Sequence, residues 1–469
     1  MMSNVRRLFS IIMIIAMIGA LLLSGCGNKD TKHTTPSSEK NKGSQSVSQK
    51  SKNANANGVT EVTFWQPDWG ADQMAALKKA VDSFNKTHKN IRVRLVILPW
   101  SDGNFTGFDT KLISAIAGNN PPDIVNGERS CVPEWAAKAL LEDISDLVKR
   151  DGINANDYYQ GPWEACIYNG KQYAMPLQSD TRALLYNKTL FKKAGLDPNS
   201  PPKTIDELDQ MAEKLTIKDA NGNYTQLGYV PWWGQGSHWV SVTYLFGGKM
   251  VNSNGNITPN DPNIVKSLQW IVGYAQKYGY DKVNQMANQL KLNTDPFYAG
   301  RVAMRYSGSY EIPNLIKPDN NISFEWDFAP LPTTGVGDYS PAWGGGAAVA
   351  IPKGAKHRDA AWEFIKFITG KEGQEMLMSS TLSILGDLSP LPSVNKEFEN
   401  KLDPHYKKLI DDIFPKTNPV PATPVTGTLA GFMGEAINNA LQGKGDPKAL
   451  LDDVKKKIDA ELAKPIYER

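Results

Sequence analysis

The sequence is poor in cysteine and histidine and carries no strong excess of either charge. Its 469 residues include three cysteines, five histidines, 52 basic and 49 acidic residues. So few cysteines exclude a scaffold held together by disulfides. A formal charge of +3 leaves no electrostatic footprint for a duplex nucleic acid, whose binding depends on neutralising phosphates. The length exceeds that of one ordinary core, so we expect two or more domains or lobes.

Enzyme motifs are also absent. The sequence has no GxxxxGK[ST], HExxH or GxSxG, and Gly344-Gly345-Gly346 lacks the GxGxxG spacing. Residues 219–223 begin like a calcium loop, but Tyr224 and Val230 stand where that loop needs Gly and Glu, which predicts a turn instead. We therefore predict a protein that is not an enzyme, with no catalytic residues, no metal site and no cofactor.

The first residues have the pattern of an export signal. Arg6 and Arg7 precede an apolar run at 8–23, which is too short to span a bilayer comfortably. The run ends in Leu23-Ser24-Gly25-Cys26, which resembles the bacterial lipobox. The sequence thus predicts a lipoprotein signal peptide at 1–25 and a diacylglycerol group on Cys26, which would anchor the protein to the outer face of the cell membrane.

Residues 26–58 are predicted to be this lipidated cysteine and a disordered tether. From residue 27 to 58 there is no Phe, Trp, Tyr, Leu or Ile, so the segment has too little apolar surface to fold. The signal contributes +2 and the tether +4, so residues 59–469 carry a net charge of −3. The basic residues in excess therefore belong to the leader and tether, where they favour an anionic membrane surface.

From residue 59 the hydrophobic pattern alternates between strand and helix. Strands are predicted at 59–65, 91–97 and 123–125, and helical spacing occurs at 74–84 and 112–116. This order predicts an α/β fold with a parallel-rich sheet. Further helices are predicted after the capping box at 204–207, at 264–278 and at 451–462. Cys131 and Cys166 are compatible either with a disulfide or with two separate buried thiols.

Aromatic residues cluster in predicted loops next to polar residues. These are Trp65 and Trp69, Trp232 with Trp233 and Trp239, Tyr306 and Tyr310, and Trp343 before three glycines. Exposed aromatics are costly, so they serve either as packing or as a ligand platform. An aromatic face with charged hydrogen-bonding groups suits a sugar ring, which has apolar C–H faces and a hydroxyl rim.

An ordered series of motifs resembles a known family. The motifs are Pro122-Asp123-Ile124-Val125, residues 170–176, 185–191 and 204–208, Gly300-Arg301-Val302-Ala303-Met304, Gly308-Ser309-Tyr310, Leu331-Pro332, 345–353 and Ala360-Ala361-Trp362-Glu363-Phe364. Together they resemble the extracellular solute-binding proteins, family 1, of ABC importers, which include maltose and multiple-sugar receptors. The resemblance covers about residues 59–463.

The resemblance implies a two-lobed, periplasmic-binding-protein type II-like fold with three hinge crossovers and a ligand cleft between the lobes. Motif order places lobe 1 at 59–177 plus 328–380 and lobe 2 at 178–327 plus 381–469. Carried over by position, the implied ligand-binding residues are Trp65, Gln66, Asp68, Glu128, Arg129, Asp180, Arg182, Trp232, Trp233, Tyr310, Trp343 and Gly344. Near Thr428 the sequence lacks the aromatic residue of maltose-binding relatives, which speaks against maltodextrin as the ligand.

The function implied is that of a lipid-anchored, monomeric receptor that binds a sugar, in particular an oligosaccharide, and delivers it to an ABC transporter permease. Two alternatives stay open. The first is a secreted carbohydrate-active enzyme using Glu128 and Asp180, since glycoside hydrolysis needs two carboxylates. The second is the same fold binding a charged solute, such as a glycerol phosphodiester or a polyamine. Charged residues of both signs at the implied site favour a neutral polyol.

Overall fold

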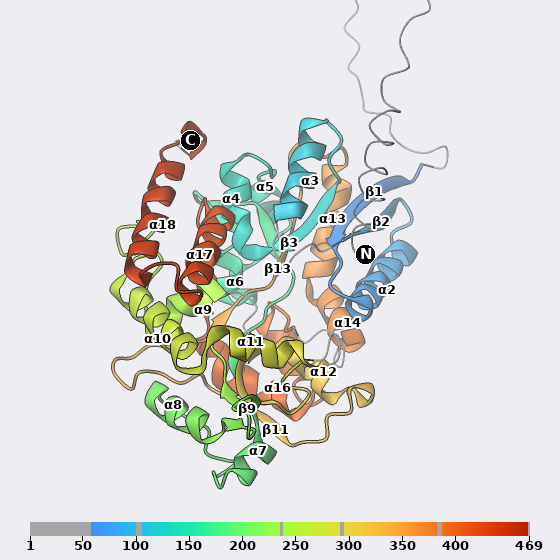
Figure 1. The fold of residues 1–469 in the computed structure, drawn as a ribbon. Helices are drawn as coiled ribbons and strands as arrows, with labels where there is room; N and C mark the ends of the chain where they lie inside the picture. The colour runs from blue at the N-terminus through green and yellow to red at the C-terminus, as the bar shows by residue number, and fades with distance from the viewer. Residues whose placement is uncertain (1–57, 100–105, 235–237, 291–294, 382–386, 468–469) are drawn as a thin grey trace, which may run out of the picture. The chain divides into compact units, whose positions relative to one another are not determined.

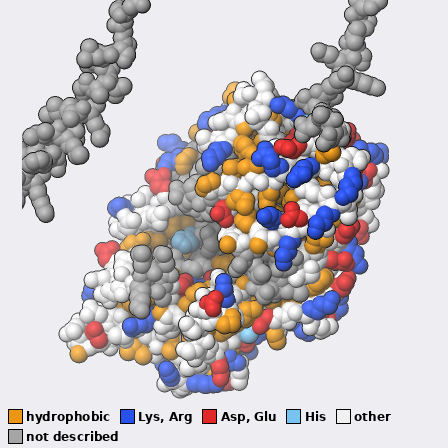
Figure 2. Space-filling model, turned by 90° about the vertical axis from the view of Figure 1, so that its right-hand side faces the viewer, with side chains coloured by type: hydrophobic (Ala, Val, Ile, Leu, Met, Phe, Trp, Pro, Cys, Tyr) orange, Lys and Arg blue, Asp and Glu red, His pale blue; other side chains and the backbone are white. Residues whose placement is uncertain are grey.

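Two five-stranded sheets organise the part of the chain that the computed structural model describes, namely residues 58–99, 106–234, 238–290, 295–381 and 387–467. The predicted signal peptide, Cys26 and all of the tether except Gly58 lie outside these residues. Figure 1 shows the two sheets with helices packed around them. Figure 2 shows basic, acidic and apolar side chains interspersed on one face. Within the described residues, no helix is long and apolar enough to cross a membrane.

The first sheet has the strand order β2-β1-β3-β13-β6. Strand β1 pairs in parallel with β2 and β3, whereas β13 is antiparallel to both β3 and β6. Its strands are β1 (Thr60–Pro67), β2 (Ile91–Leu98), β3 (Ile124–Glu128), β6 (Ala174–Pro176) and β13 (Ala347–Ala350). The carboxyl ends of β1 and β3 lie at the same edge, and the register brings Gln66 next to Asn126.

The second sheet has the order β11-β7-β10-β9-β8. Strand β7 is antiparallel to β10 and β11, and β10 is parallel to β9. Its strands are β7 (Arg182–Asn187), β8 (Ile217–Lys218), β9 (Tyr224–Tyr229), β10 (Val302–Gly308) and β11 (Trp326–Ala329). Every residue of β7 and β10 is buried, which explains their near-continuous apolar sequences. Arg182 and Arg305 are the charged exceptions to that apolar character.

Helices cover both sheets. Those that accompany the first sheet are α2 (Ala71–Thr87), α3 (Thr106–Ala117), α4 (Val132–Ala137), α5 (Ser145–Arg150), α6 (Gln160–Glu164), α13 (Arg358–Thr369) and α14 (Lys371–Thr381). The others are α7 (Lys188–Lys193), α8 (Ile205–Lys214), α9 (His238–Tyr244), α10 (Pro262–Tyr278), α11 (Tyr280–Asn288), α12 (Ile312–Ile316), α15 (Pro392–Phe398), α16 (Pro404–Lys408), α17 (Thr426–Leu441) and α18 (Pro447–Leu462). Helices α17 and α18 pack side by side, as Figure 1 shows.

Three chain crossovers join the two sheets and lie next to one another. The first runs from β6 to β7, and the third returns after α14. They pair at Ser179 and Leu388, whose backbones exchange two hydrogen bonds of 2.8 and 2.7 Å. The second runs from β11 to β13 and contains β12 (Trp343–Gly344), which pairs with β14 (Asn418–Pro419). Because β11 ends at Ala329 within the second sheet, this crossover begins just after the boundary at 328 that the sequence predicts.

Several local predictions are confirmed. The side chain of Thr204 accepts a hydrogen bond from the backbone of Glu207, and the carboxylate of Glu207 accepts one in return, so the capping box forms at the start of α8. Residues 219–223 form a turn around the Asp219 carboxylate. Cys131 and Cys166 are both buried and are not joined by a disulfide, so of the two alternatives the structure has separate thiols.

Candidate functional site

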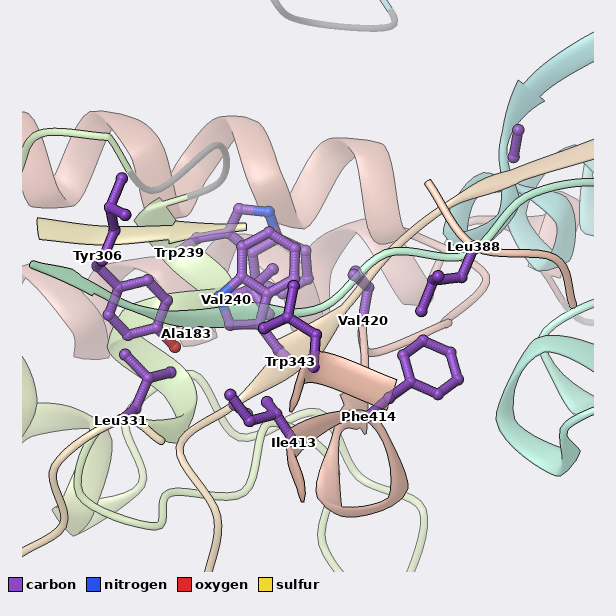
Figure 3. Close-up of a cluster of buried hydrophobic side chains, with 14 of the residues drawn as sticks. Ala183, Trp239, Val240, Tyr306, Leu331, Trp343, Leu388, Ile413, Phe414 and Val420 are labelled. Carbon is purple, nitrogen blue, oxygen red and sulfur yellow. The ribbon is translucent and has the colours of Figure 1, made fainter. Parts of the chain in front are cut away.

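The side chain of Arg182 lies between two of the predicted aromatic residues. Its guanidinium carbon is 3.8 Å from the centroid of the Trp343 ring and 5.0 Å from that of Tyr310. Trp343 is 2% exposed and donates from Nε1 to the Ser241 hydroxyl at 3.0 Å. Figure 3 shows the Trp343 side chain in a buried apolar cluster. One face of the indole is therefore covered by Arg182, and a ligand that reached that face would first meet the guanidinium.

Asp180 connects Arg182 to the glycine-rich crossover. One carboxylate oxygen is 2.8 Å from Arg182, and the other accepts from the backbone N–H of Gly345 at 2.5 Å. The crossovers approach so closely that a Cβ on Gly344 would lie 2.3 Å from the Asp180 carbonyl oxygen. Gly346, with a φ of +128°, would place a Cβ 2.1 Å from the Gln178 carbonyl oxygen. Gly344 and Gly346 thus allow two hinge strands to pack together.

Arg129 binds both of these crossovers through their backbone. Its guanidinium donates to the carbonyl oxygen of Gln178 at 2.6 Å and to that of Gly345 at 2.5 Å. The residue is 5% exposed, and this burial lowers its pKa from the ordinary value although the nearby acidic groups oppose the shift. Arg129 therefore holds the hinge together with donors that face carbonyl groups.

Two further carboxylates belong to this cluster. A Cβ on Gly345 would lie 3.0 Å from a Glu128 oxygen and 3.4 Å from an Asp180 oxygen, so the two side chains converge on that glycine. Burial, with the negative charge of Asp180 as the second cause, raises the pKa of Glu128 to about 7. Burial and the charge of Asp180 also raise the pKa of Asp387 well above its usual range. With a pKa of about 7, Glu128 is only partly ionised at neutral pH.

At the end of β1, the predicted residues have different environments. The Gln66 side chain is fully buried and accepts from the Asn126 amide at 2.6 Å, so it belongs to the interior of the first sheet. Trp65 is half-buried and packs against the small core around Trp135. Asp68 is exposed and caps the turn before α2 by accepting from Gly70 N–H at 3.0 Å.

A cavity of about 270 Å³ lies beside β10 of the second sheet. Trp232 and Trp233 line it, and both indole N–H groups donate to the same Asn284 oxygen, at 3.1 and 3.2 Å. Trp232 is buried and Trp233 is half-buried. Tyr310 connects this cavity to Arg182, because its hydroxyl donates to the Gly234 carbonyl at 3.0 Å. The cavity is large enough for one pyranose ring.

The polar wall of this cavity is an ion-pair network that includes buried Arg305. Arg305 Nη1 lies 2.6 Å from Asp295, its Nη2 pairs with Glu311, and its Nε has no partner among the described residues. The second Glu311 oxygen accepts from the Tyr298 hydroxyl. The two carboxylates outweigh the single positive charge of Arg305, so the wall offers hydrogen-bonding groups and disfavours an anionic ligand.

The structure groups the predicted residues into three sets. Glu128, Arg129, Asp180, Arg182, Tyr310, Trp343 and Gly344 meet at the hinge; Trp232 and Trp233 line the cavity that Tyr310 adjoins; and Trp65, Gln66 and Asp68 lie at the end of β1. The sequence reasoning missed Arg305, Asp295, Glu311 and Asp387. A signal for Arg305 existed, because a charged residue inside the apolar run Val302–Tyr306 indicates a buried, paired charge. Asp387 has no such local signal.

The two sheets, the three adjacent crossovers and the aromatic and charged groups beside them define a two-lobed solute receptor of the type II-like fold. A family model for the bacterial extracellular solute-binding protein matches residues 68–375. The chain therefore belongs to the bacterial extracellular solute-binding protein family. The family consists of substrate-binding proteins.

Individual relatives support the same conclusion. A solved structure described as CpMnBP1 with mannotriose bound is 30% identical, covers 85% of this chain and 99% of its own, and has a TM-score of 0.73. The maltose-bound MalE3 of T. maritima, 21% identical with coverages of 86% and 100% and a TM-score of 0.70, shares the fold.

Curated relatives include the sn-glycerol-3-phosphate-binding periplasmic protein UgpB of Pectobacterium atrosepticum, 26% identical over 336 residues, which are 68% of this chain and 71% of that protein. The match to UgpB of Escherichia coli, at 28% identity, spans 56% of this chain and 59% of the relative.

Proposed function

We propose that this protein is a receptor that binds a neutral oligosaccharide between its lobes and presents it to an ABC transporter permease. We take lobe 1 to consist of residues 59–177 and 330–380, and lobe 2 of residues 178–329 and 381–469. The twelve residues carried over from the family resemblance would supply the contacts. Cys26 would carry the lipid that keeps the receptor, as a monomer, at the outer face of the cell membrane.

The observation that carries the proposal is the pairing of the arginines at the candidate site. Arg182 pairs with Asp180, Arg129 donates to two backbone carbonyls, and Arg305 lies between Asp295 and Glu311. A phosphate ester would need a cation that is not already neutralised. A sugar needs aromatic faces with hydrogen-bonding groups at the rim, which Trp233, Tyr310 and Asp295 supply.

The comparisons support this choice to different degrees. The relative with mannotriose bound is matched over nearly all of its length, whereas the UgpB proteins are matched over a smaller share and at lower identity. The glycerol-phosphate alternative therefore has relatives in its favour, but the arginines that the described residues place at this site already have carboxylate or carbonyl partners. The enzyme alternative has only Glu128 and Asp180, and these carboxylates face the hinge backbone.

Isothermal titration of the purified full chain in detergent tests the proposal. We expect heat of binding for at least one neutral oligosaccharide in a panel that includes mannose-, glucose- and galactose-based chains of two to four units. We expect none for sn-glycerol 3-phosphate. Binding of the phosphate and of no sugar would refute the proposal. Chromatography of the recovered ligand after prolonged incubation tests the enzyme alternative, and we expect the oligosaccharide to be intact.

A further inference from the structure

Glu134 makes a direct contact between helices that accompany different sheets. The residue lies in α4, and its carboxylate accepts a hydrogen bond of 2.5 Å from the backbone N–H of Gly427, in the first turn of α17. The other oxygen lies 3.5 Å from the Thr428 hydroxyl and 2.5 Å from Lys138 Nζ. Glu134 is 5% exposed, so these groups replace most of its water.

The two helices belong to different packing units. Helix α4 directly follows β3 and η1 (Arg129–Cys131) of the first sheet, and its Val132 and Trp135 pack in the small core with Cys131 and Cys166. Helix α17 packs against α9, α10 and α18. The hydrogen bond from Gly427 to Glu134 therefore joins the side of the molecule that holds the first sheet to the helices of the other side, where α17 also packs against α4 and η1.

The energetics of this contact depend on the two helices staying together. The unpaired N–H groups of a helix N-terminus favour a carboxylate. Movement of α4 away from α17 would break the bond and return Glu134 to water, with Lys138 as its remaining partner. The hydrogen bond forms only when the two lobes are close together. Because it stabilises one of two conformations, it shifts the population toward that conformation.

We propose that Glu134 is a clasp that stabilises the closed conformation and thereby raises ligand affinity without touching the ligand. The inference rests on the proposed function, because a contact that stabilises the closed conformation affects binding only if the lobes close over a solute. The effect on affinity would be the same factor for every ligand that requires closure, because the clasp adds a constant to the free energy of closing.

The test compares two variants of Glu134 with a matched control in the full chain. Glu134→Gln keeps the shape and removes the charge, and Glu134→Ala removes the group. Glu142→Gln is the control. The Glu142 carboxylate also accepts hydrogen bonds from a lysine and a backbone N–H, those of Lys353 and Gly354. These contacts lie within the first lobe, where Leu141 forms a β-bridge with Pro352. Circular dichroism identifies any variant that does not fold, and the folded ones are compared.

The direct readout is the distance between spin labels at Lys149→Cys in α5 and Lys266→Cys in α10, both exposed positions. In ligand-free protein, we expect Glu134→Gln and Glu134→Ala to shift the distribution to longer distances, and Glu142→Gln to leave it unchanged. A distribution unaffected by both Glu134 variants would overturn the clasp. This measurement needs no ligand, so it decides on the clasp even if no sugar binds.

The second readout is affinity for any two oligosaccharides that bind. We expect both Glu134 variants to weaken binding of the two sugars by the same factor, about 5- to 30-fold. Loss of affinity for only one sugar would mean that Glu134 contacts that ligand, which contradicts a role limited to closure.

Discussion

The guanidinium of Arg182 lies 3.8 Å from the centroid of the Trp343 ring and pairs with the carboxylate of Asp180 at 2.8 Å. These two contacts couple an aromatic residue of the second crossover to the charged residues of the first. Burial alone would lower the pKa of Arg182, but the charge and hydrogen bond of Asp180 raise it above its ordinary value. The arginine is thus a permanently charged link between two hinge strands.

Replacing Arg182 with lysine separates charge from shape. Arg182→Lys keeps the positive charge near Asp180 but loses the planar face that stacks between Trp343 and Tyr310. We expect oligosaccharide affinity to fall about 5- to 30-fold, since a desolvated cation–π contact is worth roughly 1–2 kcal/mol. Titration calorimetry measures this change. Arg301→Lys, at an exposed arginine that donates to the Thr225 carbonyl, serves as the control and should bind normally.

Removing the Trp343 side chain tests its share in packing. Trp343→Ala should lower the free energy of unfolding by about 3–5 kcal/mol, because the indole is almost fully buried. Ser241→Ala, which removes the acceptor of the indole N–H and the hydroxyl's hydrogen bond to Tyr306, should cost about 1 kcal/mol. Urea unfolding followed by fluorescence measures both. Equal, small losses in the two variants would contradict the view that Trp343 is a structural support for Arg182.

Trp233 is the half-buried indole of the cavity beside β10. Trp233→Ala should weaken sugar binding by a factor of about ten, in keeping with a lost stacking surface of roughly 1 kcal/mol or more. The control is Trp326→Ala, since Trp326 stacks on His405 at 3.8 Å in β11, away from the cavity. Similar affinities for Trp233→Ala and the unmodified protein, measured by titration calorimetry, would show that the cavity takes no part in binding.

Glu128 predicts a specific dependence of stability on pH. Its folded pKa of about 7 exceeds the ordinary value of 4.5, so the folded state binds the proton more tightly than the unfolded state. The stability that it contributes is therefore full below pH 4.5 and declines as the pH rises to 7, by on the order of 1–3 kcal/mol. Asp387, whose pKa is also raised, acts in the same direction.

Glu128→Gln should reduce the decrease in melting temperature between pH 4.5 and 7. At pH 8 the variant should have a higher melting temperature than the unmodified protein. Glu325→Gln is the control with the opposite sign, because its hydrogen bond to Lys192 lowers the pKa of Glu325 and places its effect below pH 4.5. If the melting temperature of the Glu128 variant fell as steeply with pH as that of the unmodified protein, Glu128 would not be the cause of this pH dependence.

Local sequence patterns predicted the elements of this fold well. The alternation at residues 91–97, the capping box at Thr204 and the spacing of the apolar residues in α10 and α18 each depend on contacts between near neighbours, which a sequence displays directly. The order of motifs was enough to predict the family and its type II-like fold. The glycines at 344–346 were visible as a motif, but the sequence did not show why they are required.

What only the tertiary structure decided is how charges from distant segments are paired. Arg129 binds carbonyls 49 and 216 residues away, Glu134 meets α17 across 293 residues, and Arg305 is buried between two acids. No local periodicity encodes such contacts, because they depend on which loops the sheets bring together. The sequence determined a two-lobed receptor with aromatic and charged residues in its loops. The tertiary structure decided which of these residues support the hinge and which face a cavity, since burial and charge pairing exist only in the folded chain.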